Sequence, residues 1–184
     1  MSCRVLGVDA CKAGWAGIVL SDGAASSYFA TVIGDLAEQA GTGGPLDVIA
    51  IDMPIGLPDA GGRQADVLDS GPRSPGEEDY VLATAVNVEV TGKGISRQAY
   101  GLRARILEVG RWVRHAPHRV VEIHPEVSFA CLAGAPLDVS KSTWAGVARR
   151  RRLLAAEGIV LAEDLGAAGE KTGVDDILDA VIAA

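Results

Sequence analysis

Five short apolar runs stand out along the chain, and each of them predicts a β-strand. The runs are Arg4–Asp9, Trp15–Leu20, Tyr28–Val32, Val48–Asp52 and Val120–Ile123. Continuous apolar runs of this length are typical of strands that are buried on both faces. The tripeptide Ser21-Asp22-Gly23 predicts a hairpin turn, so the second and third strands should be antiparallel neighbours.

In the segments between and after these strands, apolar residues recur with the period of an α-helix. The expected helices are Ile33–Ala40, Glu77–Val90, Ser96–Val113, Glu126–Leu132, Ser142–Glu157 and the segment from Val174 to the end. The last helix has an apolar face with the spacing i, i+3, i+4, i+7, i+8, made of Val174, Ile177, Leu178, Val181 and Ile182. Residues 53–76 are rich in Pro, Gly and Asp and predict an irregular excursion.

This order of elements predicts an α/β fold, in which a mixed five-stranded sheet is flanked by helices on both faces. The second strand should run antiparallel to the first and the third. A helical insertion at about 53–115 should separate the fourth strand from the fifth, within a single domain over residues 1–184. The residues expected to be buried are Val5, Leu6, Val8, Ile18, Val19, Ile49, Ile51, Val121, Ile177, Leu178 and Val181.

Composition narrows the class of protein. Hydrophobic residues make up 48% of the chain against 22% charged, which is ample for a core. The three cysteines form no CxxC pair, which argues for a reducing compartment and against a disulfide framework or a cysteine zinc site. No apolar stretch is long enough for a signal peptide or a membrane span, so we expect a soluble cytoplasmic protein without a membrane partner.

Charge alone does not identify a partner. The formal net charge of −7 argues against non-specific nucleic-acid binding. The four consecutive arginines at 149–152 wrap most of the way round a helix, so a solvated face is their expected role. The sequence leaves the oligomeric state open.

Three of the predicted strands end on or near an acid, and this pattern is the first indication of a site. The acids are Asp9, Asp52 and Glu122. A single strand-end Asp is explained by capping of a turn, but three buried strands that each deliver a carboxylate are not. In open α/β sheets, ligands bind in the crevice outside the strand ends, so we expect these acids to be catalytic.

The C-terminal helix adds two more acids, Asp176 and Asp179, which are three residues apart and hence neighbours. Interaction with the helix macrodipole explains Asp175 and Asp176, but it explains Asp179 poorly because that residue lies a turn inside the helix. Clustered carboxylates repel one another unless cations are present. Mg²⁺ or Mn²⁺ supplies that charge, and two such ions ~3.5–4 Å apart activate water for attack on a phosphodiester.

The sequence also resembles a known family. The strings that carry the resemblance are "GVDACKAGWAG", "IDMPIGLPD", "TGKGISRQAYGLRARILEV", "VVEIHPEVSF" and "DDILDA", in this order. They are similar to those of the family of predicted RNase H-like nucleases, over essentially the whole chain. The Asp-x-x-Asp-Ala ending resembles that of bacterial Holliday-junction resolvases in particular.

The resemblance implies a ribonuclease H-like fold and a metal-dependent nuclease. In that superfamily a first-strand Asp, a fourth-strand acid and a C-terminal helical pair are metal ligands. These roles would fall on Asp9, Asp52, Asp176 and Asp179. Glu122 and the string "HPE" have no settled counterpart in the resolvases, and the insertion at about 53–115 is specific to the family.

Several other side chains are candidates for contact with the substrate. They are Lys12, Arg63, Arg73, Lys93, Arg97 and His124. For the arginines the alternative is a salt bridge within a loop, and for His124 it is a structural hydrogen bond. The substrate should be structured or branched nucleic acid, or a small phosphodiester, and not bulk duplex, given the acidic chain. The sequence does not distinguish DNA, RNA and nucleotide.

Two other classes of protein compete with the nuclease. Sugar kinases and actin-like ATPases also begin with an apolar strand that ends in Val-Asp, but they need two such domains, and 184 residues supply one. The second class is a catalytically idle binding or scaffold protein on an RNase H-like fold. Metal binding by the acids separates the nuclease from the scaffold.

Overall fold

The computed structural model describes residues 3–55, 77–92, 94 and 97–184. The chain forms two compact units. The first consists of Met1–Met53 with His115–Ala184, and the second is Pro54–Arg114. The first unit contains the sheet, and the second contains helices from the region predicted to be an insertion.

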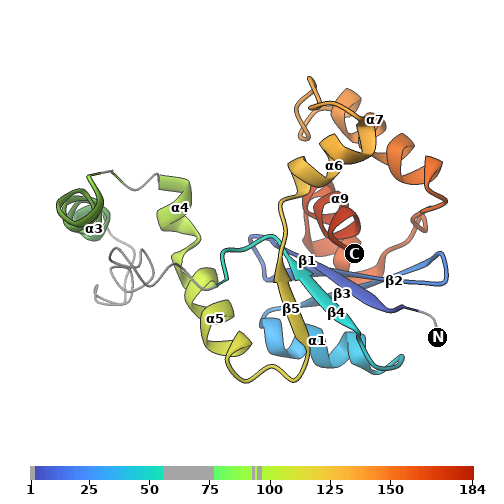
Figure 1. Ribbon diagram of the computed structural model, residues 1–184, viewed down its shortest axis with the longest axis horizontal. Coiled ribbons are helices and arrows are strands. Elements are labelled where there is room, and N and C mark those ends of the chain that lie inside the picture. The colour runs from blue at the N-terminus through green and yellow to red at the C-terminus, as the bar shows by residue number, and fades with distance from the viewer. Residues whose placement is uncertain (1–2, 56–76, 93, 95–96) are drawn as a thin grey trace. The chain divides into compact units, whose positions relative to one another are not determined.

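The sheet has five strands in the order β3-β2-β1-β4-β5. Their bounds are β1 Val5–Ala10, β2 Trp15–Ser21, β3 Ala24–Ala30, β4 Val48–Ile51 and β5 Arg119–Glu122. β2 is antiparallel to β1 and to β3, whereas β4 is parallel to β1 and β5 is parallel to β4. The prediction of a mixed sheet with an antiparallel second strand is confirmed (Figure 1).

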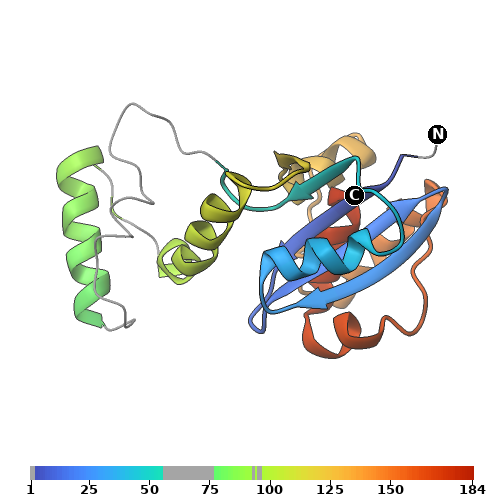
Figure 2. The same cartoon turned by 90° about the horizontal axis from the view of Figure 1, so that it is seen from below.

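Helices lie on both faces of this sheet. Those of the first unit are α1 Ile33–Gly41, α6 Pro125–Ala133, α7 Trp144–Ala156, α8 Gly166–Lys171 and α9 Val174–Ala183. α1 covers one face, and α9 packs with α6 and α7 on the opposite face (Figures 1 and 2). None of the helices among the described residues is both long enough and apolar enough to cross a membrane.

The second unit contains three helices within its described residues, α3 Glu77–Thr91, α4 Arg97–Gly101 and α5 Arg103–Val113. The rings of Tyr80 and Tyr100 meet edge to face with their centroids 5.3 Å apart, which joins α3 to α4. The guanidinium of Arg103 lies 4.2 Å from the centroid of the Tyr100 ring. A cation–π contact therefore extends this small aromatic cluster to α5.

The structure differs from the predicted elements at four points. β3 begins at Ala24, immediately after the turn, because as an edge strand it does not need the continuous apolar run that the prediction sought. The helix predicted over 96–113 is two helices, with Leu102 between α4 and α5. The helix α8 was not predicted. Val5 and Val121 are partly exposed rather than buried, since Val5 begins its strand and Val121 lies on the edge strand β5.

Helix α9 approaches strand β1 without an intervening side chain, because the residue beneath it is Gly7. A Cβ atom at Gly7 would lie 2.0 Å from the carbonyl oxygen of Ala180 and 2.5 Å from the backbone nitrogen of Ala184. Side chains alternate along a strand, so Asp9 shares the α9 face with Gly7. The close contact thus places the acids of α9 near the acid of β1.

We predict that Gly7→Ala displaces α9 from the sheet. Overpacking against backbone costs about 1–3 kcal/mol, and this contact should reach the upper end of that range because a helix carbonyl cannot rotate away. Chemical denaturation would measure the loss. Gly41→Ala at the end of α1 is the control, since a Cβ there meets nothing within 4 Å. Equal stability of the two variants would contradict the packing described.

Candidate functional site

Asp9 and Asp52 lie side by side on neighbouring strands. β1 and β4 are parallel, and Val8 lies opposite Ile51 in their register. The backbone N–H of Asp52 continues the ladder, because it donates to the carbonyl oxygen of Val8 at 3.1 Å. One position beyond the Val8–Ile51 pair, Asp9 and Asp52 therefore both point to the α9 face of the sheet.

Helix α9 brings Asp176 and Asp179 to the same face. Asp179 is 1% exposed, whereas Asp176 is partly exposed near the start of the helix. Oδ2 of Asp176 accepts a hydrogen bond from the backbone N–H of Gly173 at 3.0 Å. Asp176 therefore stabilises the N-terminus of its own helix, while Asp179 lies one turn further inside.

These four acids form one electrostatic group, which we call the acidic cluster (Asp9, Asp52, Asp176 and Asp179). Burial raises the pKa of Asp9 from 3.8 to about 8, and the charges of the other three acids contribute to this shift. The backbone N–H of Ala10 donates to Oδ1 of Asp9 at 2.7 Å and opposes the shift. Burial is also the largest cause of the raised pKa of Asp52, Asp176 and Asp179. An added cation would relieve this repulsion.

Lys141 belongs to the site, although the sequence did not point to it. Its ammonium donates a hydrogen bond to Oδ2 of Asp179 and forms a salt bridge with that carboxylate. Lys141 lies in the polar stretch that precedes α7, where a single lysine looks the same as a solvated one. Only the fold brings it to Asp179, 38 residues further along the chain.

The other predicted residues of the first unit are less closely tied to the acidic cluster. Glu122 lies opposite Ile51 in the register of β4 and β5, so it points to the α1 face. His124 is exposed just before α6. Burial raises the pKa of Asp52, and an electrostatic interaction with His124 opposes this in part. Lys12 is exposed in the turn that follows β1.

The remaining predicted contacts lie elsewhere in the chain. Arg97 belongs to the second unit, where its guanidinium lies 4.7 Å from the centroid of the Tyr80 ring. Arg63, Arg73 and Lys93 lie outside the described residues. The contacts of these four side chains with a substrate stay predictions.

The donors of the acidic cluster suit a hard divalent cation, because Mg²⁺ and Mn²⁺ prefer carboxylate oxygens. Oδ1 of Asp179 is buried and has no hydrogen-bond partner, so one oxygen remains free for a cation. In the part of the chain that the structure describes, no three Asp, Glu, His or Cys side chains are already arranged to hold a metal ion. The residue types therefore fit a metal ion. Their present arrangement, with Lys141 bound to Asp179, is not that of a metal-bound site.

The solvated face predicted for residues 149–152 is wrong at one position. Arg150 is 1% exposed, and its Nη2 donates to both carboxylate oxygens of Glu126 at 2.8 Å. The other three arginines are exposed. The bidentate pair joins α7 to α6, and Glu126 supplies the charge that allows a guanidinium to be buried.

Comparison with known proteins identifies one family. A family model described as "Protein of unknown function (DUF429)" matches residues 7–184. No curated protein and no solved structure matches the chain.

We predict that the metal-free protein loses stability as the pH rises from about 4 to about 8. Asp9 keeps its proton in the folded state up to about pH 8 but releases it above 3.8 when unfolded, so rising pH favours unfolding across this window. Melting curves in EDTA should show a fall on the order of 10 °C, because each pH unit of the window costs about 1.4 kcal/mol and each kcal/mol lowers the melting temperature by a few degrees for a chain of this size.

Asp9→Asn imitates the protonated carboxyl group and should flatten this pH dependence. The exposed Asp22→Asn in the β2–β3 turn is the matched control and should follow the wild type. A wild-type melting temperature that is constant or rises over this range would contradict the electrostatics of the acidic cluster.

Proposed function

Because the family match covers residues 7–184, the chain belongs to the DUF429 family, and we propose that it is a metal-dependent nuclease. In this proposal the acidic cluster binds divalent ions, and the protein hydrolyses phosphodiester bonds by a two-metal-ion mechanism on a ribonuclease H-like fold. The mixed five-stranded sheet flanked by helices is compatible with that fold.

One observation carries the proposal: acids from three separate elements, β1, the end of β4 and α9, meet on one face of the sheet, where burial and the charges of the other three acids raise the pKa of Asp9. Carboxylates buried in this way destabilise a protein unless a cation compensates them. The buried Oδ1 of Asp179, which has no partner, adds a second indication of an absent ligand. A protein without a use for the cluster gains nothing from keeping these charges together.

Each acid has a role that follows from its position. Asp9, on which burial and the charges of the other three acids act, would hold the ions together with Asp52 and Asp179. Asp176 holds the start of α9 through Gly173 and is placed to bind from the edge of the cluster. When bound, Mg²⁺ or Mn²⁺ activates water and stabilises charge on the phosphate oxygens.

Helix α7 supports a nucleic-acid substrate. Trp144 is 87% exposed, and Arg151 and Arg152 are exposed at positions i+7 and i+8 from it, hence on one face of the helix. Exposed aromatic rings stack on bases, and arginines bind phosphates. This face begins three residues after Lys141, whose ammonium contacts Asp179 of the acidic cluster.

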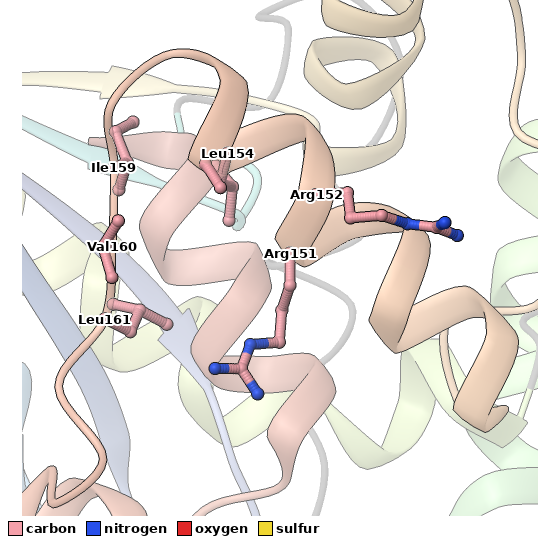
Figure 3. Close-up of a pocket in the computed structure, with 7 residues that line it drawn as sticks. Arg151, Arg152, Leu154, Ile159, Val160 and Leu161 are labelled. Atoms are coloured by element: carbon pink, nitrogen blue, oxygen red, sulfur yellow. The ribbon is translucent and has the colours of Figure 1, made fainter.

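A surface pocket of about 210 Å³ lies beside the two arginines (Figure 3). The apolar side chains of Ile159, Val160 and Leu161 line it together with residues of α7, and Val160 is 71% exposed. An apolar pocket whose lining includes two arginines offers both kinds of contact that a nucleotide makes, apolar for the base and cationic for the phosphate. We therefore propose structured or single-stranded nucleic acid as the substrate rather than bulk duplex.

We predict that Asp52→Asn removes both metal binding and hydrolysis. The variant keeps the shape of the side chain and removes a charge, so it should slightly stabilise the metal-free protein. In the wild type, Mn²⁺ at about 100 times its Kd should stabilise the fold by about 2.7 kcal/mol per ion. Thermal melts with and without Mn²⁺, together with cleavage of junction, hybrid and single-stranded substrates, are the measurements.

A capping role for Asp52 would give the opposite pattern. Its loss would then destabilise the protein by ~0.5–2 kcal/mol with or without metal. If millimolar Mn²⁺ shifts neither melting curve, the metal-dependent nuclease is contradicted. The catalytically idle scaffold protein is then the better explanation of the fold. Cleavage that continues in EDTA would point to a contaminant or another mechanism.

We predict that reversing the charge of Arg151 and Arg152 together weakens binding of a labelled single-stranded oligonucleotide. Loss of two phosphate contacts should also reduce the dependence of log K on log salt by about 1.4, at about 0.7 per contact. Arg114 and Arg119, which are both exposed, provide a control double variant with the same change in net charge. Equal weakening by both pairs would show that net charge, and not the α7 face, controls binding.

A further inference from the structure

The ammonium group of Lys141 interacts with more acids than the one it contacts. It donates to Oδ2 of Asp179, and the charges of Asp9 and Asp175 also act on it. Burial lowers the pKa of Lys141, but the bond to Asp179 and these negative charges outweigh burial, so the pKa is raised. The positive charge of Lys141 in turn opposes the raised pKa of Asp52 and Asp176, which burial causes. Lys141 is therefore a cation within the acidic cluster.

The turn that carries Lys141 is held on both sides. The hydroxyl of Thr143 donates to the carbonyl oxygen of Ser140 at 2.8 Å and accepts from the backbone N–H of Gly146 at 3.1 Å, which caps α7. A Cβ atom at Gly146 would lie 1.9 Å from that same carbonyl oxygen, so only glycine allows this approach. Buried Arg150 donates to the carbonyl oxygen of Val139 at 3.3 Å. The backbone thus presents Lys141 to α9 from a fixed position.

The contact with Lys141 uses only one of the two carboxylate oxygens of Asp179. Oδ2 accepts from Lys141, while Oδ1 is buried without a partner. A carboxylate that binds metal uses the oxygen lone pairs that the ammonium now occupies. The lysine therefore occupies an oxygen that a metal ion at Asp179 would use.

We propose that the Lys141 ammonium is a tethered cation that occupies the position of a divalent ion at Asp179 and must be displaced when metal binds. This inference rests on the proposed function for the identity of the ion as Mg²⁺ or Mn²⁺. The metal-free cluster is then held together by Lys141, and metal enters by competition with it. Because of this competition, the apparent association constant for metal equals the intrinsic constant multiplied by the fraction of molecules in which the lysine has withdrawn.

The side chain of Lys141 suits this role. It is 37% exposed, so a path to solvent lies open beside the pair. Lysine carries a compact charge on a flexible stem of four carbons, and rotation about that stem moves the ammonium away without moving the backbone. The fixed turn and the mobile stem together allow release and return.

The test is the affinity for Mn²⁺, measured from the electron paramagnetic resonance signal of the free ion without any substrate. Lys141→Met removes the charge and keeps most of the stem, and it should bind Mn²⁺ about tenfold more tightly than the wild type, equivalent to about 1.4 kcal/mol. Its melting temperature in EDTA should fall, and its gain in melting temperature on addition of Mn²⁺ should exceed that of the wild type.

Two variants control for folding and for net charge. Lys171→Met makes the same change in charge at a lysine that lies over the Phe29 ring, and its affinity for Mn²⁺ should equal that of the wild type. Lys141→Gln repeats the test with a polar side chain if the methionine variant does not fold, and it should also bind more tightly. Both are checked by circular dichroism before titration.

The possible outcomes separate this inference from the proposed function. Tighter binding by the Lys141 variants supports the tethered cation even if no nucleic acid is cleaved. Unchanged or weaker binding in a folded Lys141 variant overturns it even if the wild type is an active nuclease, because the lysine would then support the ligands instead of competing with metal. If wild type and variants all fail to bind Mn²⁺, both ideas fall.

Discussion

The contact between α9 and β1 at Gly7 is the constraint on which the rest of the structure depends. A helix normally packs on a sheet through a layer of side chains, but here the carbonyl oxygen of Ala180 lies where a Cβ of Gly7 would be. The helix is therefore close enough to bring Asp179 to Asp9. The same face of α9 buries Ile177, Leu178 and Val181 in the core, so apolar packing holds the acids together against their repulsion.

The protein balances its buried charges in two different ways. Glu126 and Arg150 form a complete pair, in which one guanidinium meets both oxygens of one carboxylate. Among the residues that the structure describes, the acidic cluster has four acids and one contacting ammonium, from Lys141, so negative charge is in excess there. A proton on Asp9 relieves part of that excess near neutral pH, as its raised pKa indicates. An incomplete balance of this kind is what a site for a removable cation requires.

The position of α7 connects the two sets of charges. Arg150 ties the helix to α6, Gly146 lets its first turn close on Ser140, and the segment before it carries Lys141 to the acidic cluster. The face that carries Trp144 and its exposed arginines therefore belongs to the helix whose preceding segment contacts the acids. If the protein is a nuclease, α7 and the segment before it connect the surface that binds the strand to the acids on β1, at the end of β4 and on α9.

Local patterns in the sequence were enough to predict most elements and four of the acids of the site. Apolar runs are set by neighbouring residues, so β1, β2, β4 and α9 could be recognised without knowing the fold. The mixed sheet also followed, because the hairpin turn and the order of the elements restrict the topology. The strand-end positions of Asp9 and Asp52 and the spacing of Asp176 and Asp179 marked them as one group.

The tertiary structure alone decided which charges meet. Register parity places Asp9 and Asp52 on the α9 face and Glu122 on the other, which depends on pairing between strands far apart in the chain. Lys141 and Arg150 look like ordinary surface cations in the sequence, since their partners lie 38 and 24 residues away. Electrostatic interactions act over long distances and leave no periodic pattern in the sequence. The partner of a charged side chain is therefore known only once the packing of apolar side chains has fixed the path of the backbone.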